Sequence, residues 1–268
     1  MNNFIFRIFK LSALVLLINS CSVNKARIDN DLKSYFDKYN VDGCFTMLNN
    51  ADGEITVYNM NMDTARFSPA ATFKLISSLI ALQTGVVTDE KMIIKSNNSD
   101  SNNIGENIHD GFKIDGTPFF HEVARRIGKK TMQSWIDSLS YGNKITEGPI
   151  DSFWFNNKLK ISPDEQLGLL KKLYFDQLPF RKSVQETVRR FMLEEDNSAY
   201  KLSYKMGFAI NESKEKLGWV VGWIEENRHV YFFTTLIKTD NSNIDIKEIR
   251  LNVLKDILKH YGFFEGKK

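Results

Sequence analysis

Short apolar runs and segments with a helical periodicity of apolar residues follow one another along the chain in a definite order. Runs rich in β-branched and aromatic residues occur near both ends, at residues 43–49 and 54–59 and again at 203–209, 217–226 and 230–238. Between them, apolar residues recur every three to four positions at residues 118–127, 130–139, 163–173 and 182–193. The runs are typical of β-strands and the repeats of amphipathic helices. This order predicts an α+β fold, in which a central antiparallel sheet from the two chain ends is flanked by helices and carries an inserted all-helical lobe.

A buried helix is predicted at residues 69–83, because apolar side chains occupy nearly every face of it. Ser68 suits the N-cap of this helix and Pro69 its first position. Residues 50–53, with the sequence Asn-Ala-Asp-Gly, predict a hairpin turn between the first two strands. Residues 245–261 predict a last amphipathic helix.

The N-terminus has the pattern of a targeting segment. Arg7 and Lys10 precede an apolar run at residues 11–18, which is too short to span a bilayer and is typical of a signal peptide. The run ends at Ser20 and Cys21 in a sequence that resembles a bacterial lipoprotein box, so we expect Cys21 to be acylated. An ordinary signal peptide with a chance cysteine is the alternative. The expected parts are a signal peptide at 1–20, a tether at 21–33 and a folded domain at 34–268, in an exported bacterial lipoprotein anchored to a membrane of the cell envelope.

Composition narrows the classes of partner. The 268 residues, 42% of them apolar, suit one large domain or two interleaved lobes. Net charge is +3, and without Arg7 and Lys10 the count is 34 bases (36 minus 2) against 33 acids, which argues against a nucleic-acid partner. With Cys21 lipidated, Cys44 has no cysteine to pair with and is expected to be a small buried hydrophobe. The four histidines show no metal-ligand spacing, so neither a metal nor a cofactor is expected.

Several motifs occur in the order of one known family. They are Pro69-Ala70-Ala71-Thr72-Phe73-Lys74, Tyr141-Gly142-Asn143, Asp151-Ser152-Phe153-Trp154, the segment 159–166, Lys205-Met206-Gly207, the segment 218–223, and Arg250. From about residue 43 to the C-terminus, the chain resembles class D β-lactamases, the oxacillinases of the penicillin-binding, serine transpeptidase-like superfamily. The corresponding family patterns are P-A-S-T-F-K, Y-G-N, D-x-F-W, L-x-I-S-x-x-E-Q, K-[ST]-G and W-V-G-W.

The resemblance implies a β-lactamase/transpeptidase-like fold and assigns a role to each matched position. Ala71 takes the place of the nucleophile and Asp115 that of a second, proton-shuttling serine; Lys74 and Lys205 are the two active-site lysines, and Trp154 packs over the first of them. The positions implied for ligand binding are Met206, Gly207, Phe208 and Arg250. The family's oxyanion hole corresponds to the backbone N–H groups of Ala71 and Phe208.

Three hydroxyl groups of the family pattern are replaced here. The nucleophile is Ala71, the second serine is Asp115, and the Ser/Thr that binds the substrate carboxylate is Met206. Removal of the nucleophile of a serine hydrolase costs on the order of 10⁶ in kcat, whereas binding and the oxyanion hole survive. The sequence therefore predicts that acylation is lost, while binding of a ligand remains open.

Other hydroxyls near Lys74 are weak replacements for the missing serine. Thr72 is expected to point away from Lys74, because successive helical positions differ by about 100°. Ser78 lies deeper in the apolar helix, and Ser68 is expected to be occupied as the N-cap. His121, on a helix of mixed polarity, is interpreted as a packing or surface histidine.

Three hypotheses of function follow. The first is a catalytically degenerate class D-like lipoprotein that still binds a β-lactam or a peptidoglycan stem peptide. The second is an active β-lactam hydrolase with a substitute nucleophile, and the third is a structural or interaction protein of the envelope. In the active family the lysine carries a carbamate. Here we expect Lys74 to be a protonated amine, with Asp115 between Lys74 and Lys205; Asp115 as a solvated turn residue is the alternative.

Overall fold

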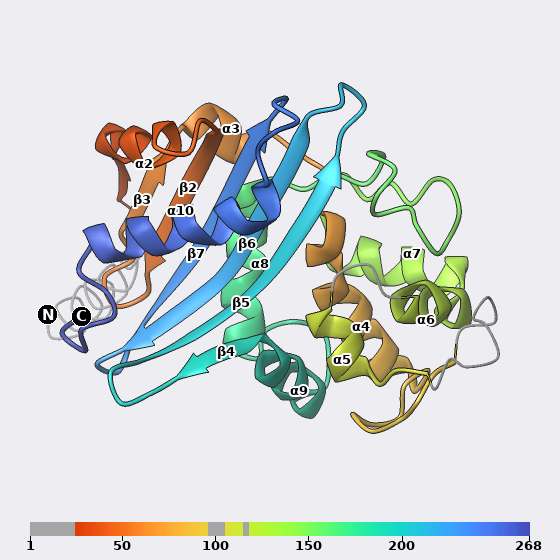
Figure 1. Cartoon of the computed structure of the whole chain (residues 1–268). Coiled ribbons are helices and arrows are strands. Elements are labelled where there is room, and N and C mark those ends of the chain that lie inside the picture. The colour runs from red at the N-terminus through yellow and green to blue at the C-terminus, as the bar shows by residue number, and fades with distance from the viewer. Residues whose placement is uncertain (1–24, 96–104, 115–117) are drawn as a thin grey trace, which may run out of the picture.

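A central β-sheet organises the computed structural model, which describes residues 25–95, 105–114 and 118–268 (Figure 1). Within these residues the sheet has seven strands in the order β1-β3-β2-β7-β6-β5-β4. The strands are β1 (Ala26–Ile28), β2 (Asp42–Asn49), β3 (Ile55–Tyr58), β4 (Leu193–Asp196), β5 (Tyr200–Ile210), β6 (Lys216–Glu226) and β7 (His229–Thr239). All neighbours pair antiparallel except β1 and β3. The predicted α+β fold, with the sheet built from both chain ends, is confirmed.

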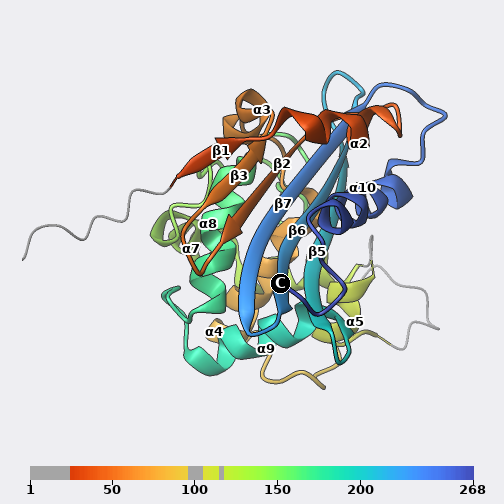
Figure 2. The same cartoon turned by 90° about the vertical axis from the view of Figure 1, so that its left-hand side faces the viewer.

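Helices cover both faces of the sheet. On one face lies α10 (Ile246–His260), with η2 (Asn30–Leu32) and α2 (Lys33–Asp37) beside it, and on the other lies α8 (Pro163–Tyr174) (Figures 1 and 2). A helical lobe continues on the side of α8. It contains η3 (Ala70–Phe73), α4 (Lys74–Thr84), α5 (Ile108–Lys113), α6 (Phe119–Ile127), α7 (Lys129–Ser138) and α9 (Lys182–Met192), and α3 (Met60–Thr64) packs between β2 and α8. The predicted all-helical insertion is therefore present.

The sheet separates two hydrophobic cores. Along β7, Phe232 and Leu236 pack into the core on the α8 side, whereas Phe233 and Ile237 pack into the core on the α10 side. Alternate side chains of a strand point to opposite faces, so a strand covered on both faces is apolar at nearly every position. This explains why the C-terminal strands appear in the sequence as continuous apolar runs.

The first turn of the buried helix differs from its prediction. Residues 70–73 form the 3₁₀ helix η3, and the α-helix begins only at Lys74. Ser68 is not the N-cap, since its Oγ donates a hydrogen bond of 2.9 Å to the carbonyl oxygen of Trp154. Pro69 occupies the cap position and no side chain caps the helix. The Ser68 hydroxyl thus makes a tertiary hydrogen bond to Trp154 in place of the local capping bond that was predicted.

Part of the expected tether also differs. This segment forms β1, which pairs with β3, and then η2. The sheet therefore begins within the polar stretch that was predicted to be a tether. The signal peptide and Cys21 lie outside the described residues, and their assignments stay predictions. No helix within the described ranges is long and apolar enough to cross a membrane.

Candidate functional site

The segment that carries the nucleophile position is held in a strained turn. Ala70, directly before Ala71, has a left-handed backbone with φ of 49°. For an alanine this conformation costs roughly 1–2 kcal/mol, because Cβ crowds the following carbonyl. Ala71 itself is only 4% exposed and presents a methyl group. Strain of this kind is found where a protein needs one backbone geometry at a site.

The Y-G-N motif helps to position this segment. Gly142 has φ of 50°, and a Cβ there would lie 2.0 Å from the carbonyl oxygen of Lys160, so only glycine fits. The next residue, Asn143, exchanges hydrogen bonds with Lys160 through its backbone N–H and its side-chain oxygen. Ile161 in turn pairs with Phe67, which leads into η3. The motif therefore acts as a scaffold for the chain that enters the site.

Of the three candidate hydroxyl groups near Ala71, those of Thr72 and Ser68 make other hydrogen bonds, and that of Ser78 is buried. Thr72 Oγ1 donates to the carbonyl oxygen of Pro69 at 2.6 Å and accepts from Gln166 Nε2 at 3.2 Å. Ser68 donates to Trp154, as described above. Ser78 is fully buried inside α4. That none of these residues replaces the nucleophile stays a prediction.

Lys74 is the first residue of α4, and its amine is enclosed by α5. Its Nζ donates hydrogen bonds to the carbonyl oxygens of Gly111, at 2.8 Å, and Ile114, at 2.6 Å. The same nitrogen lies 5.2 Å from the centre of the Phe120 ring, and the residue is 4% exposed. Carbonyl oxygens and an aromatic face both favour a positive charge. This environment fits an ammonium group.

The second lysine approaches the same helix from the sheet. Lys205 on β5 is 4% exposed, and its Nζ lies 5.1 Å from the centre of the Phe112 ring in α5. Two residues on, Gly207 packs directly against η3, since a Cβ there would lie 3.0 Å from Thr72 Cγ2 and 3.1 Å from the Thr72 nitrogen. The structure thus brings Ala71, Lys74, Lys205 and Gly207 to one junction of lobe and sheet.

The predicted ligand-binding side chains divide between the two faces of β5. Met206 and Phe208 alternate with Lys205 and Gly207, and they pack against the core on the α10 side. Arg250, on α10, is 3% exposed and donates from Nη1 to the carbonyl oxygen of Gly207 at 2.5 Å. The arginine therefore meets the strand at the residue that also contacts η3.

An aromatic cluster supports the lobe side of the site. Trp154, 2% exposed, stacks on Phe73 with ring centres 5.4 Å apart and an interplanar angle of 20°. Phe73 immediately precedes Lys74, so this stack fixes the segment that carries the lysine. The ring centres of His121 and Trp154 lie 5.9 Å apart, which fits the interpretation of His121 as a packing histidine.

Sequence reasoning missed the role of α5, since contacts to both lysines come from this helix and the residue that follows it. A signal was present, because Asn107 caps the helix by accepting from the Asp110 N–H, and Ile108 and Phe112 lie one turn apart on its buried face. Asp115 lies outside the described residues. Its predicted place between the lysines stays a prediction, as does the oxyanion hole of Ala71 and Phe208.

Cys44 and possible metal-binding side chains are the remaining features of interest in the structure. Cys44 is fully buried, and burial, with a smaller effect of the Asp63 charge, raises the pKa of its thiol well above the ordinary range. The prediction of a buried hydrophobic cysteine is confirmed. Among the described ranges, no group of three or more His, Cys, Asp and Glu side chains is arranged to hold a metal ion.

Comparisons with known proteins agree with this arrangement. Residues 43–259 match the family model of the penicillin binding protein transpeptidase domain. The probable β-lactamase YbxI of Bacillus subtilis (strain 168) is 33% identical over 245 residues, which cover 90% of this chain and 86% of that protein. The crystal structure of the class D β-lactamase YbXI from Nostoc aligns with a TM-score of 0.81 and 30% identity, covering 88% of this chain and 100% of the other.

A receptor domain has the same fold. The C-terminal domain of the Bacillus licheniformis BlaR penicillin-receptor aligns with a TM-score of 0.81 and 26% identity, over 90% of this chain and 98% of that domain. The chain belongs to the penicillin-binding-protein transpeptidase family. Its relatives within that family include class D β-lactamases, as the motifs predicted.

Proposed function

We propose that the protein is a non-hydrolysing class D β-lactamase-like lipoprotein that binds a β-lactam or a peptidoglycan stem peptide without acylation. The observation that carries the proposal is Ala71 at the nucleophile position, in the strained turn before Lys74. A methyl group cannot attack a carbonyl carbon, so the chemistry that defines the hydrolases has no starting point.

The bonding of the neighbouring hydroxyls argues against a substitute nucleophile. An attacking hydroxyl needs a base and an open path to the substrate. Thr72 and Ser68 instead donate to backbone carbonyl oxygens, and Ser78 is enclosed by α4 and its neighbours. Lys74 also donates to carbonyl oxygens, which disfavours a neutral amine acting as a base.

Retention of the binding scaffold supports the ligand-binding half of the proposal. Gly207 still allows β5 to pack on η3, and Arg250 still meets β5 at that glycine. The same fold serves as a penicillin receptor in the BlaR domain, so a function other than hydrolysis has a precedent in this architecture. Arg250 is the cation that would face a ligand carboxylate.

A structural role without a ligand is favoured by a different observation. Ala71, Lys74 and Lys205 are each 4% exposed, and α5 lies over both lysines. A buried lysine pair gives a β-lactam little surface to contact. An equilibrium measurement separates this role from ligand binding.

The test combines covalent and non-covalent measurements on one sample. Incubation with a penicillin and intact-mass measurement should show no adduct, and nitrocefin hydrolysis should stay at background, with an active class D β-lactamase as the positive control. An adduct of drug size on a residue between Ser68 and Ser78 would overturn the proposal. Calorimetric binding of the penicillin that Arg250→Ala weakens would support binding without turnover, whereas no binding would leave the structural role.

A further inference from the structure

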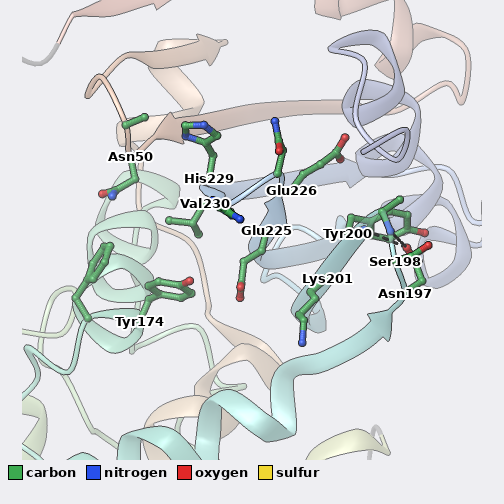
Figure 3. A pocket seen from close by; sticks show the side chains of 15 residues that line it. Asn50, Tyr174, Asn197, Ser198, Tyr200, Lys201, Glu225, Glu226, His229 and Val230 are labelled. Atoms are coloured by element: carbon green, nitrogen blue, oxygen red, sulfur yellow. Dashed lines mark hydrogen bonds between the residues drawn. The ribbon is translucent and has the colours of Figure 1, made fainter. Parts of the chain in front are cut away.

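A polar hollow lies at one end of the sheet, away from Lys74. It has a volume of about 490 Å³, is open to solvent, and is lined by the β6–β7 turn, the start of β5, the end of α8 and residues 50–51 of the β2–β3 turn (Figure 3). Its walls combine charged and aromatic residues, notably Tyr174, Phe175, Lys201, Glu225, Arg228 and His229. The size is within the range of small-molecule sites. None of the positions matched to the family's site lines this hollow.

The turn at its rim holds an arginine in an unfavourable conformation. Glu226 and His229 are paired, so Asn227 and Arg228 form a two-residue loop, with φ of 48° and 66°. Such a type I′ turn favours Asn followed by Gly, because both residues need positive φ. Asn227 fits this rule and Arg228 does not. The Arg228 side chain therefore belongs to the rim of the hollow, on a backbone conformation that glycine would adopt at lower cost.

A carboxylate faces the interior of the hollow. Glu225 is half-buried and lies opposite Lys201 on the neighbouring strand. Lys201 forms its ion pair with Asp196 instead, at 2.9 Å, and among the described residues no ion pair joins Glu225 to a cation. Figure 3 shows the Glu225 side chain directed toward Tyr174. Burial raises the pKa of Tyr174, and the charge of Glu225 and a hydrogen bond with its side chain add to this effect, whereas the charge of Arg189 opposes it.

The rest of the hollow is partly apolar, and one of its walls is held by hydrogen bonds. Tyr174 and Phe175 pack edge to face with ring centres 5.0 Å apart, and Phe175 is 39% exposed. Glu226 is buried and accepts backbone hydrogen bonds from Phe264 and Lys267, which fixes the end of β6. An apolar surface therefore stands beside the Glu225 carboxylate on a preformed frame.

We propose that this hollow binds a free α-amino acid with an apolar side chain, as its zwitterion. The ammonium group would bind the Glu225 carboxylate, the carboxylate would bind the Arg228 guanidinium, and the side chain would contact Tyr174 and Phe175. A simple cation would leave Arg228 without a partner, and a simple anion would face Glu225. The proposal is independent of β-lactam or stem-peptide binding at the family's site.

Three related probes separate the two charges in a calorimetric titration of the purified protein. Phenylalanine carries both charged groups, phenethylamine lacks the carboxylate and 3-phenylpropionate lacks the ammonium group. Phenylalanine should bind at least about tenfold more tightly than either of the others, since each loses one charge-assisted contact. Equal affinity for all three, or no binding of phenylalanine at millimolar concentration, would overturn the proposal.

Two substitutions assign the charges to residues. Glu225→Gln should weaken phenylalanine and phenethylamine by about tenfold and leave 3-phenylpropionate unchanged. Arg228→Gly should weaken phenylalanine and 3-phenylpropionate but raise Tm by roughly 2 °C, because glycine relieves the left-handed strain. Opposite movement of affinity and stability is not expected of a merely structural residue.

A matched control exists in the opposite turn. Lys214, between β5 and β6, also has a left-handed backbone, with φ of 64°, and does not line the hollow. Lys214→Gly should raise Tm in the same way and leave the affinity for phenylalanine unchanged. If Arg228→Gly behaves like this control in both measurements, the turn has no part in binding and the proposal fails.

Discussion

The amine of Lys74 donates a hydrogen bond of 2.6 Å to the backbone carbonyl oxygen of Ile114, at the end of α5. A second bond, to the Gly111 carbonyl, comes from the same short helix. The C-terminal end of a helix carries partial negative charge, so the lysine both satisfies exposed carbonyls and neutralises that charge. The residue that would take a proton in an active enzyme here connects α4 to α5.

This bonding predicts that Lys74 does not form the carbamate of active class D enzymes. A carbamate needs a neutral amine and adds negative charge, which the two carbonyl oxygens would repel. In ¹³CO₂-labelled buffer at mildly alkaline pH, carbon NMR should show no carbamate signal that depends on this residue. A resonance that disappears in Lys74→Ala would contradict the assignment.

Removal of the amine should destabilise the lobe. Lys74→Met keeps most of the side-chain volume but leaves the carbonyls of Gly111, in a buried contact, and Ile114, in a partly buried one, without this donor. We expect a loss of about 2–4 kcal/mol in the free energy of unfolding, measured by urea denaturation. Lys130→Met, at an exposed position on α7, is the control and should change it by less than about 0.5 kcal/mol. Equal effects of the two substitutions would deny Lys74 a structural role.

Restoration of the nucleophile alone should not restore an enzyme. Ala71→Ser returns a hydroxyl beside Lys74, but Asp115 and Met206 still lack the hydroxyls that the family resemblance assigns to proton transfer and carboxylate binding. Residues that act as a unit are not additive, so nitrocefin turnover should rise little. The triple variant Ala71→Ser, Asp115→Ser, Met206→Thr should gain far more. Robust turnover by the single variant would contradict the idea that activity was lost through all three replacements together.

The sheet and the long helices were predictable because their patterns are local. Strands covered on both faces give continuous apolar runs, and α8 begins at a capping box of Ser162 and Glu165, visible as S-x-x-E. The short elements β1, β4, α3 and α5 escaped prediction. Each contains three to six residues and depends on contacts made by other parts of the chain.

The candidate site was predictable only as far as motifs reach. They gave Ala71, Lys74, Lys205 and Arg250, because each stands in a recognisable local sequence. No local pattern shows that Ser68 would bond to Trp154, some 86 residues away, rather than cap its helix. Partners distant in sequence are set by tertiary packing.

Membrane attachment is expected to depend on Cys21. The apolar run at 11–18 and the lipoprotein-like box motivate this prediction. In a bacterial host, Cys21→Ala should abolish incorporation of labelled palmitate and move the protein from the membrane fraction to the soluble one. Cys44→Ala is the control, because that thiol is buried in the domain. A Cys21 variant that still sediments with membranes would exclude the lipid anchor.

An acidic group is buried on the α8 side of the sheet. Asp63, on α3, is 2% exposed, and burial raises its pKa from 3.8 to about 6. The hydroxyl of Thr46, which donates to the carboxylate, offsets part of this shift, and the charge of Asp164 adds slightly to it. The folded protein therefore binds a proton at Asp63 more tightly than the unfolded chain does.

The fold should gain stability when Asp63 takes up its proton. Because the folded pKa is above the unfolded one, the stabilisation is complete below about pH 4 and is lost as pH rises through 6. The two pKa values differ by about two units, which corresponds to roughly 3 kcal/mol as an upper bound. The carboxylates with lowered pKa, such as Glu165 and Glu122, act in the opposite direction but titrate below their ordinary pKa of 4.5. The range from pH 7.5 to 5 therefore isolates Asp63 from them.

Asp63→Asn tests this assignment, because the amide keeps an acceptor for Thr46 and removes the titrating proton. The variant should be more stable than the parent at pH 7.5, by up to about 3 kcal/mol, and should lose the parent's gain in urea midpoint between pH 7.5 and 5. Asp240→Asn, at an exposed position, should keep the parent's pH dependence. If Asp63→Asn and the parent respond to pH in parallel, the buried carboxylate does not control stability in this range.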